Sequence, residues 1–155
     1  MEKIRRATVN DIEILAKLLY EVQSVHHHVR PDLFKENTKK YTDDELVNII
    51  KNDSTPIFVY ENGKILGYAF CIIKEEISHT LTNIKTLYID DLCVDENARR
   101  NHIGMKLYNF VLEYAKSIKC YNLTLNVWAD NINALKFYEK IGLKSQKIGM
   151  EKILK

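Results

Sequence analysis

The sequence predicts a single-domain mixed α/β fold over residues 1–155, with a mostly antiparallel sheet of about seven strands flanked by about four helices. Strand-like and helix-like patterns alternate along the chain. Hairpin-connected strands come early and a strand-helix-strand unit comes late, which favours a parallel pair there. Only two prolines and five glycines interrupt the chain, so no domain boundary is indicated. Apolar residues make up 46% of the sequence, enough for a buried core.

The chain opens with a strand and a helix. A short strand is expected at residues 4–7. Thr8 and Asp11 then resemble a capping box in which aspartate replaces the usual glutamate. Apolar residues at helical spacing follow, so the first helix is expected from about residue 11 to residue 24. The polar run at residues 26–30 is expected to end it.

The central region begins with a second helix and continues into a hairpin. Thr42 and Glu45 form another capping box, and the apolar residues behind it give a short helix one buried face. An apolar strand follows at residues 57–60. Asn-Gly at residues 62–63 tolerates positive φ and is a strong hairpin signal. The return strand is expected at residues 64–74.

The remaining elements alternate between strand and helix. A strand is expected at residues 82–94, and apolar residues at helical spacing predict a helix over 102–118. Alternation predicts a strand at residues 122–128. A short helix at 132–141 and a last strand at 146–154 complete the chain.

Composition and charge exclude several classes of protein. The net charge is +2, which argues against a dedicated nucleic-acid binder. No apolar run is long enough to span a bilayer, and Met1–Arg6 lacks the apolar stretch of a signal peptide. Cys71, Cys93 and Cys120 are an odd number without close spacing, so buried thiols are expected rather than disulfides. A cytoplasmic location and no membrane partner are therefore expected.

The most informative stretch runs from Leu92 to Gly104, where an apolar strand ends and a helix opens. A helix N-terminus presents unpaired N–H groups and a partial positive charge. After a loop containing Arg99 and Arg100, these donors would bind a pyrophosphate, and Gly104 would allow close backbone approach. The alternative is an ordinary strand-to-helix turn with solvated arginines.

This stretch resembles the acetyl-CoA signature of the GNAT acetyltransferase superfamily. The signature is Gln/Arg-x-x-Gly-x-Gly/Ala after a Leu-x-Val strand, and it matches the run Arg99-Arg100-Asn101-His102-Ile103-Gly104 after Leu92-Cys93-Val94. His102 stands where the first glycine of the signature lies. We expect the helical φ of a first-turn residue at this position, which costs nothing, whereas a positive φ would strain a histidine.

A second motif of the superfamily is Asn-x-x-Ala/Ser-x-x-Phe/Leu-Tyr-x-x-x-Gly-Phe. It matches the run from Asn131 through Ala134, Phe137, Tyr138 and Gly142 to Leu143, with leucine in place of the last phenylalanine. The resemblance implies that Asn131 contacts the pantetheine arm and that the Tyr138 hydroxyl lies near the CoA sulfur. Without the motif, Tyr138 would be interpreted as a core tyrosine on an amphipathic helix.

The resemblance implies acetyl-CoA as the cosubstrate, bound in a notch where two parallel strands diverge. The residues it assigns to acetyl-CoA binding are Leu92, Cys93, Val94, Arg99, Arg100, Asn101, His102, Ile103, Gly104, Met105, Asn126, Asn131 and Asn133. A backbone N–H near Leu92 or Val94 would stabilise the oxyanion. Tyr138 would protonate the departing thiolate.

Asp90 and Asp91 are the candidates for handling the acceptor amine, because they lie side by side in an otherwise apolar strand. Adjacent strand residues face opposite sides, so only one normally reaches the cleft unless a bulge breaks the alternation. Alternatively, one is exposed and the other caps a loop. The run from Ile89 to Leu92 is similar to the Leu-Glu-Asp-Phe run of spermidine/spermine acetyltransferases, whose acids hold a cationic amine and help deprotonate it.

The loop after the first helix borders the acceptor cleft in this superfamily. The resemblance therefore implies substrate contacts for His28, Arg30 and Phe34. Consecutive histidines in a loop cannot all face one ion, so no metal site is expected at residues 26–28.

The predicted function is transfer of acetyl from acetyl-CoA to a primary amine of a small, polyamine-like molecule, by direct attack in a ternary complex. Two alternatives stay open: a protein N-terminal or lysine acetyltransferase, and a non-catalytic acyl-CoA-binding sensor. The resemblance also allows a homodimer.

Overall fold

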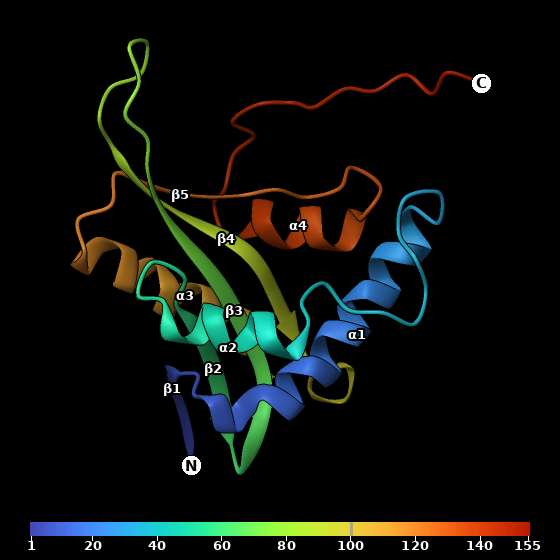
Figure 1. The fold of residues 1–155 in the computed structure, drawn as a ribbon, viewed down its shortest axis with the longest axis vertical. Helices are drawn as coiled ribbons and strands as arrows, with labels where there is room; N and C mark the ends of the chain where they lie inside the picture. The colour runs from blue at the N-terminus through green and yellow to red at the C-terminus, as the bar shows by residue number, and fades with distance from the viewer. Residues whose placement is uncertain (100) are drawn as a thin grey trace.

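The computed structural model describes residues 1–99 and 101–155 and contains one five-stranded mixed sheet (Figure 1). The strands lie in chain order and are β1 (Glu2–Arg6), β2 (Ile57–Asn62), β3 (Lys64–Glu75), β4 (Lys85–Val94) and β5 (Asn122–Leu125). The helices are α1 (Ile12–Val29), α2 (Asp43–Lys51), α3 (Ile103–Ser117) and α4 (Ile132–Lys140). β1 to β4 pair antiparallel, and β4 pairs with β5 in parallel. The mixed fold and the late parallel pair are therefore confirmed.

The expected count of about seven strands is wrong, because the last part of the chain forms fewer strands than its pattern indicates. β5 ends at Leu125 rather than at residue 128. Residues 146–154 pair with no described strand, and Met150 is 92% exposed. Alternating apolar residues form a strand only where a neighbour supplies hydrogen bonds. Figure 1 shows this C-terminal segment running away from the sheet.

The predicted end of the first helix is also wrong. α1 continues through the three histidines to Val29, and the Arg30 N–H donates to the carbonyl oxygen of His26 at 2.8 Å. Histidine is only a moderately poor helix former, so packing of the preceding turns decides the outcome. Both predicted capping boxes are confirmed. In the second, the Glu45 N–H donates to Thr42 Oγ1 at 3.1 Å, while the Thr42 N–H donates to Glu45 Oε1 at 2.9 Å.

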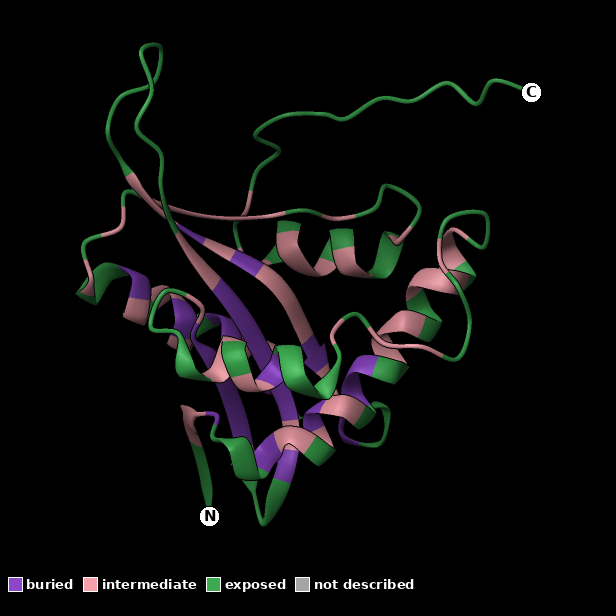
Figure 2. Cartoon of the chain, in the orientation of Figure 1, coloured by how far each residue is buried: buried purple, intermediate pink, exposed green. Residues whose placement is uncertain are grey.

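Two apolar clusters pack on the two faces of the sheet. One is centred on Leu107 and Val111 of α3, and the other on Leu15 and Leu18 of α1 with α2 beside them. Figure 2 shows the buried residues concentrated in the middle strands and in the helix faces turned toward them. Among the described residues, no helix is both long and apolar enough to cross a membrane.

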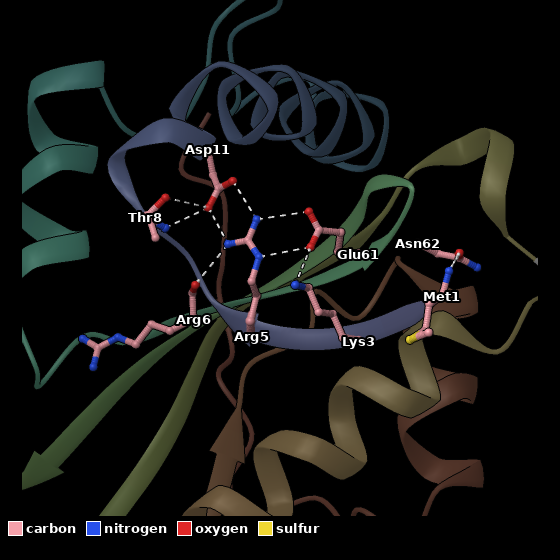
Figure 3. Close-up of polar contacts among 8 residues, drawn as sticks. All are labelled: Met1, Lys3, Arg5, Arg6, Thr8, Asp11, Glu61 and Asn62. Atoms are coloured by element: carbon pink, nitrogen blue, oxygen red, sulfur yellow. Dashed lines mark hydrogen bonds and ion pairs between the residues drawn. The ribbon is translucent and has the colours of Figure 1, made fainter.

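A partly buried ion cluster fixes the start of α1 (Figure 3). The Arg5 guanidinium donates to Asp11 Oδ2 at 2.8 Å and to Asp11 Oδ1 at 3.0 Å, and its Nε donates to Glu61 Oε1 at 3.3 Å. These bonds from Arg5 hold the pKa of Asp11 below its usual value. β1, β2 and the first turn before α1 are thereby joined, and α1 forms one wall of the candidate site described below.

Gly67 of β3 lets α3 lie close to the sheet. A Cβ at this position would lie 2.8 Å from the Cys93 carbonyl oxygen and 3.1 Å from Leu107 Cδ1. We expect Gly67→Ala to lower the free energy of unfolding by about 1–3 kcal/mol, because backbone and helix must move apart. Gly149→Ala is the control, since nothing lies within 4 Å of its added Cβ. Denaturant melts showing the same midpoint for both variants would contradict this packing.

Candidate active site

β4 loses its parallel neighbour halfway along its length. Pairing with β5 runs from Thr86 opposite Asn122 to Ile89 opposite Leu125, and β4 then continues to Val94. Alternate backbone N–H and C=O groups after Ile89 point away from β3 and face no described strand. The divergence of the parallel pair is therefore present. It offers an extended ligand a row of backbone donors and acceptors.

The opening turn of α3 lies next to this free edge. The Lys106 N–H donates to the His102 carbonyl oxygen at 3.0 Å, so the N–H groups of Ile103, Gly104 and Met105 precede the first turn's hydrogen bonds. A Cβ on Gly104 would lie 3.5 Å from Phe137 of α4 and 3.7 Å from Val94. The end of β4, the start of α3 and α4 therefore meet at one place, and the amides there suit an anionic group.

The arginines of the predicted pyrophosphate loop are only partly described. Arg99 is exposed after the short 3-10 turn Glu96–Ala98, and Arg100 lies outside the described residues. Asn101 is exposed, and its Nδ2 donates to the Ala98 carbonyl oxygen at 3.4 Å. The loop thus presents Arg99 and Asn101 to solvent beside the start of α3.

The expected helical φ at His102 is wrong. His102 precedes α3 with φ +58° and ψ +26°, the left-handed conformation that glycine adopts without cost. A non-glycine residue pays roughly 1–2 kcal/mol for this conformation. The glycine of the signature therefore reflects a real backbone requirement, and the side chain of His102 is accommodated because the residue is exposed to solvent.

This strain predicts opposite effects for two substitutions at one position. His102→Gly is expected to match or exceed the parent protein in stability by up to about 1 kcal/mol, because relief of strain offsets glycine's larger unfolded-state entropy. His102→Val is expected to lose about 1–2 kcal/mol, since β-branched residues avoid positive φ. Thermal melts of both variants check the order. A valine variant as stable as the glycine variant would show that φ is not positive in solution.

A β-bulge turns both aspartates to the same side of the sheet. Phe70 pairs with Asp91 and the next residue of β3, Cys71, pairs with Ile89, so Asp90 is the extra residue. Tyr68, which bonds Asp91, belongs to the core beneath α1 and α2, and Tyr41, which bonds Asp90, packs against the same core. The bulge thus breaks the alternation that would have left only one acid on this face.

The two carboxylates have different partners. Lys40 Nζ donates to Asp90 Oδ1 at 2.9 Å, and the Tyr41 hydroxyl donates to Asp90 Oδ2 at 2.5 Å. Asp91 Oδ2 accepts a 2.7 Å bond from the Tyr68 hydroxyl. Asp90 therefore anchors the connection between α1 and α2, while Oδ1 of Asp91 accepts from no side chain in the part of the chain that the structure describes.

Burial perturbs the protonation of both Asp91 and Tyr138, and the charge of Asp91 also acts on Tyr138. Burial raises the pKa of Asp91 from 3.8 to about 6, against the lowering effects of the Tyr68 bond and of the Lys40 charge. Burial raises the pKa of Tyr138 well above 10, and the negative charge of Asp91 raises it further. At neutral pH, Asp91 is therefore mostly ionised but readily accepts a proton, and Tyr138 keeps its proton.

The side chains at the end of β4 are packed in the core rather than presented to a ligand. Cys93 is buried, its thiol lies 3.9 Å from the Leu18 carbonyl oxygen, and burial raises its pKa well above the usual value. A neutral buried thiol is a poor nucleophile. Leu92 and Val94 pack partly against the α3 core. These residues can therefore serve a ligand through their backbone groups.

A pocket of about 420 Å³ brings together predicted cofactor and substrate residues. Asn131, Asn133 and His28 all line it, at the meeting of α1 with the start of α4. Asn131 also caps α4, because its Oδ1 accepts the Ala134 N–H at 3.3 Å. Its side-chain NH₂ group takes no part in that cap and can donate to a ligand.

Aromatic residues border the same region. The rings of Phe34 and Trp128 are 5.6 Å apart, and the guanidinium of Arg30 lies 5.7 Å from the Trp128 ring. Asp32 and Glu151 hold that guanidinium at 2.8 Å and 2.6 Å, so Arg30 is already paired on two sides. The two predicted substrate contacts thus differ in character. Phe34 belongs to an accessible aromatic pair, whereas Arg30 is already held by two carboxylates.

Asn126 lies just past the end of β5, and its Nδ2 donates to the Tyr88 hydroxyl at 3.2 Å. Lys74 Nζ lies 4.1 Å from the centre of the Tyr88 ring. Asn126 is therefore joined to the face of β4 that carries Asp90. Within the described chain, no cluster of three or more histidine, cysteine, aspartate or glutamate side chains is arranged to hold a metal ion.

The model of the acetyltransferase (GNAT) family matches residues 22–143. This chain belongs to the GNAT acetyltransferase family. That match covers the end of α1, the divergence of β4 and β5, the start of α3 and all of α4. Members of this family use acetyl-CoA.

Three known proteins are similar to this chain. Glucosamine 6-phosphate N-acetyltransferase of Arabidopsis thaliana is 27% identical over 97% of this chain and 95% of that protein. Spermine/spermidine N(1)-acetyltransferase of Bacillus subtilis strain 168 is 23% identical over 57% of this chain and 59% of that protein. A crystal structure of a mutant BH1408 protein from Bacillus halodurans is 30% identical, covers 98% of this chain and 99% of that one, and has a TM-score of 0.93.

Sequence reasoning missed three residues around the acids of this GNAT acetyltransferase. They are Lys40, Tyr41 and Tyr68. Tyr68 had a usable signal, because a tyrosine inside an apolar strand must find a partner for its hydroxyl. Lys40 and Tyr41 had none, since they lie in an irregular segment whose path depends on the packing of α1 and α2.

Proposed function

We propose that this GNAT acetyltransferase transfers the acetyl group of acetyl-CoA to a primary amine of a small molecule, by direct attack in a ternary complex. The observation that carries the proposal is the bulge at Asp90. It sets Asp90 and Asp91 on one face at the point where β4 parts from β5. Tyr138 of α4 lies near enough to Asp91 for the charge of that carboxylate to raise its pKa.

The arrangement suits each requirement of amide formation from a thioester. An alkyl ammonium has a pKa near 10 and must lose a proton before it can attack. Asp91 is mostly ionised at neutral pH and its Oδ1 accepts from no described side chain, so it binds the ammonium and passes its proton on, directly or through water. A backbone N–H near Leu92 or Val94, on the unpaired edge of β4, would stabilise the oxyanion.

Tyr138 is the proposed proton donor to the departing thiolate. A thiol has a pKa of about 8.5, so a proton moves from Tyr138 to a thiolate only in a cleft that excludes water. Burial of Tyr138 supplies that environment, and a thiolate that is desolvated beside it has a raised pKa as well. No covalent enzyme intermediate is needed, since the amine attacks the thioester directly and Cys93 is turned toward α1.

The chemistry of the cleft supports a small amine acceptor. Two acids favour a cationic group, and the aromatic pair of Phe34 and Trp128 offers an apolar surface next to His26, whose ring lies 4.9 Å from that of Phe34. Two relatives are named for the acetylation of small molecules, glucosamine 6-phosphate in one case and spermine and spermidine in the other. A cytoplasmic location and a homodimer are further proposals from the sequence.

A thiol-release screen with acetyl-CoA tests the proposal. Polyamines, amino sugars, amino sugar phosphates and short peptides are compared, and mass spectrometry identifies the acetylated product. We expect release above background with at least one small amine and a weaker response to peptides. Turnover confined to peptides would favour a protein acetyltransferase. CoA binding without release from any class would favour a sensor.

A further inference from the structure

Lys40 places a primary alkyl amine of the protein itself against Asp90, one of the two neighbouring acids. Its Nζ lies 2.9 Å from Asp90 Oδ1 and 5.4 Å from the centre of the Tyr41 ring. The side chain comes from the irregular connection between α1 and α2, not from a strand or helix. Nearly half of it, 47%, is exposed. The amine is therefore held at its tip by a charge-assisted bond, while about half of the side chain faces solvent.

The charge of Lys40 also acts on two other titratable groups, Asp91 and His26. It lowers the pKa of Asp91, opposing the larger effect of burial, and it adds to the burial effect that lowers the pKa of His26 on α1. The ammonium thus contacts Asp90, and its charge also acts on Asp91 and His26. This is the position that an acceptor ammonium would take if the acids bind it. Lys40 has the same functional group as such an acceptor.

We propose that Lys40 is an internal acetyl acceptor. Its Nζ is acetylated by the acetyl-CoA bound to its own chain when no external amine occupies the acceptor position at Asp90 and Asp91. The proposal rests on the function proposed above, because it uses the same acids and the same acetyl donor. It adds a modification site and a consequence: an acetylated Lys40 loses its charge and its ion pair with Asp90.

The step balances without any further reactant. The Lys40 ammonium gives one proton to Asp91 and on to water, and the neutral Nζ attacks the acetyl carbonyl carbon. An N–C bond forms, the second N–H proton is lost to the same relay, and the C–S bond breaks. The departing thiolate takes a proton from Tyr138, which solvent restores. One acetyl-CoA gives one acetyl-lysine, one CoA thiol and one proton.

Two other lysines are comparison sites that distinguish this reaction from uncatalysed acetylation by acetyl-CoA. Lys39 is the sequence neighbour, but its Nζ donates to the Tyr41 carbonyl oxygen at 2.7 Å and lies 3.2 Å from Asp43 Oδ1. Lys116 is 65% exposed near the end of α3 and pairs with Glu113 at 3.3 Å. If exposure governed the reaction, Lys116 would be modified before Lys40. If position at the acids governs it, Lys40 comes first.

The test is incubation of the intact protein with acetyl-CoA alone, followed by intact-mass and peptide mass spectrometry over time. We expect one acetyl group per chain, located on Lys40, appearing at least about tenfold faster than on Lys39 or Lys116. The rate should not depend on protein concentration, because donor and acceptor share one chain. Tyr138→Phe should slow modification of Lys40 but leave that of Lys116 unchanged. Lys40→Arg, which keeps the charge, should abolish the fast phase.

The same samples are assayed for acetylation of added amines, so that the two proposals fail separately. Turnover of an added amine with an unmodified Lys40 would overturn this inference and leave the proposed function standing. Equal modification of Lys40 and Lys116, unaffected by Tyr138→Phe, would also overturn it, because the reaction would then be uncatalysed. An unmodified Lys40 together with no turnover of any amine would overturn both.

Discussion

Replacing Tyr138 with phenylalanine is expected to lower kcat about 100-fold to 1000-fold while KM for acetyl-CoA changes little. The hydroxyl supplies a proton only when the thiolate departs, and general acids of this kind contribute roughly this much. The ring contact with Phe137, at 5.1 Å between centroids, is kept in the variant, so α4 should pack as before. Steady-state kinetics with the best amine of the screen measures both constants.

Tyr88→Phe is the matched control for the loss of a tyrosine hydroxyl. Tyr88 lies on the same sheet face as Asp90, but its hydroxyl accepts a bond from Asn126. We expect its kcat to stay within about threefold of the parent protein, since one exposed hydrogen bond contributes little. If the Tyr138→Phe variant had an unchanged kcat, Tyr138 would not be the proton donor to the thiolate.

Asp91→Asn is expected to lower kcat/KM at neutral pH about 100-fold or more, because the amide can neither hold an ammonium by charge nor take its proton. The pH profile gives the sharper readout. In the parent protein, kcat/KM should rise with pH through an inflection near a pKa of about 6, as Asp91 loses its proton. The variant should lack that inflection. An identical acidic limb in both proteins would assign the titration to another group.

The same substitution is expected to stabilise the fold at neutral pH. The folded-state pKa of Asp91, about 6, lies above its usual value of 3.8, so the folded state binds this proton more tightly than the unfolded state. The contribution of the protonated carboxyl to stability is therefore complete below about pH 4 and is lost as pH rises through 6. The asparagine side chain of the variant carries no charge at any pH, so the variant should gain up to about 2–3 kcal/mol above pH 6.

Urea melts at acid and neutral pH check the sign of this effect. The stability advantage of the variant should be small near pH 4, where Asp91 is protonated in the folded state, and largest above pH 6. An advantage that does not change with pH would mean that Asp91 does not titrate near pH 6 in the folded state. Higher stability with lower activity is the usual relation at a site that holds an unfavourably buried charge.

Periodicity and caps were enough to predict most of the local structure of this chain. Thr42 and Glu45 located the start of α2 to the residue, because a reciprocal cap uses only neighbours in sequence. Long-range pairing was harder to infer. Ile148 and Met150 alternate with polar or small residues as strand residues do, yet the C-terminal segment has no described strand to pair with. Alternation indicates a preference for extended backbone, but it does not show whether another strand is available to pair with it.

The site was predictable where the motif determines the backbone and unpredictable where packing decides. At His102 the motif was a better guide than our expectation of a helical φ, because the glycine of the signature marks a position of positive φ that the histidine also occupies. The bulge at Asp90 shows the second case. Its existence depends on the pairing of β3 with β4, so the sequence left open which acid faces the cleft. Lys40 and Tyr41 reach Asp90 from 50 and 49 residues away, through contacts that only the folded chain creates.

The most direct test of the site is amide-resolved NMR during titration with CoA. If the unpaired edge of β4 and the opening turn of α3 bind the pantetheine and diphosphate, the largest changes in amide chemical shift should occur at Leu92, Val94 and residues 101–105. The amide of Asn131 should show the next largest change. The amide chemical shifts of β1 and of the C-terminal segment should not change. Saturable binding that leaves residues 101–105 unchanged would show that CoA is held elsewhere and would contradict the account.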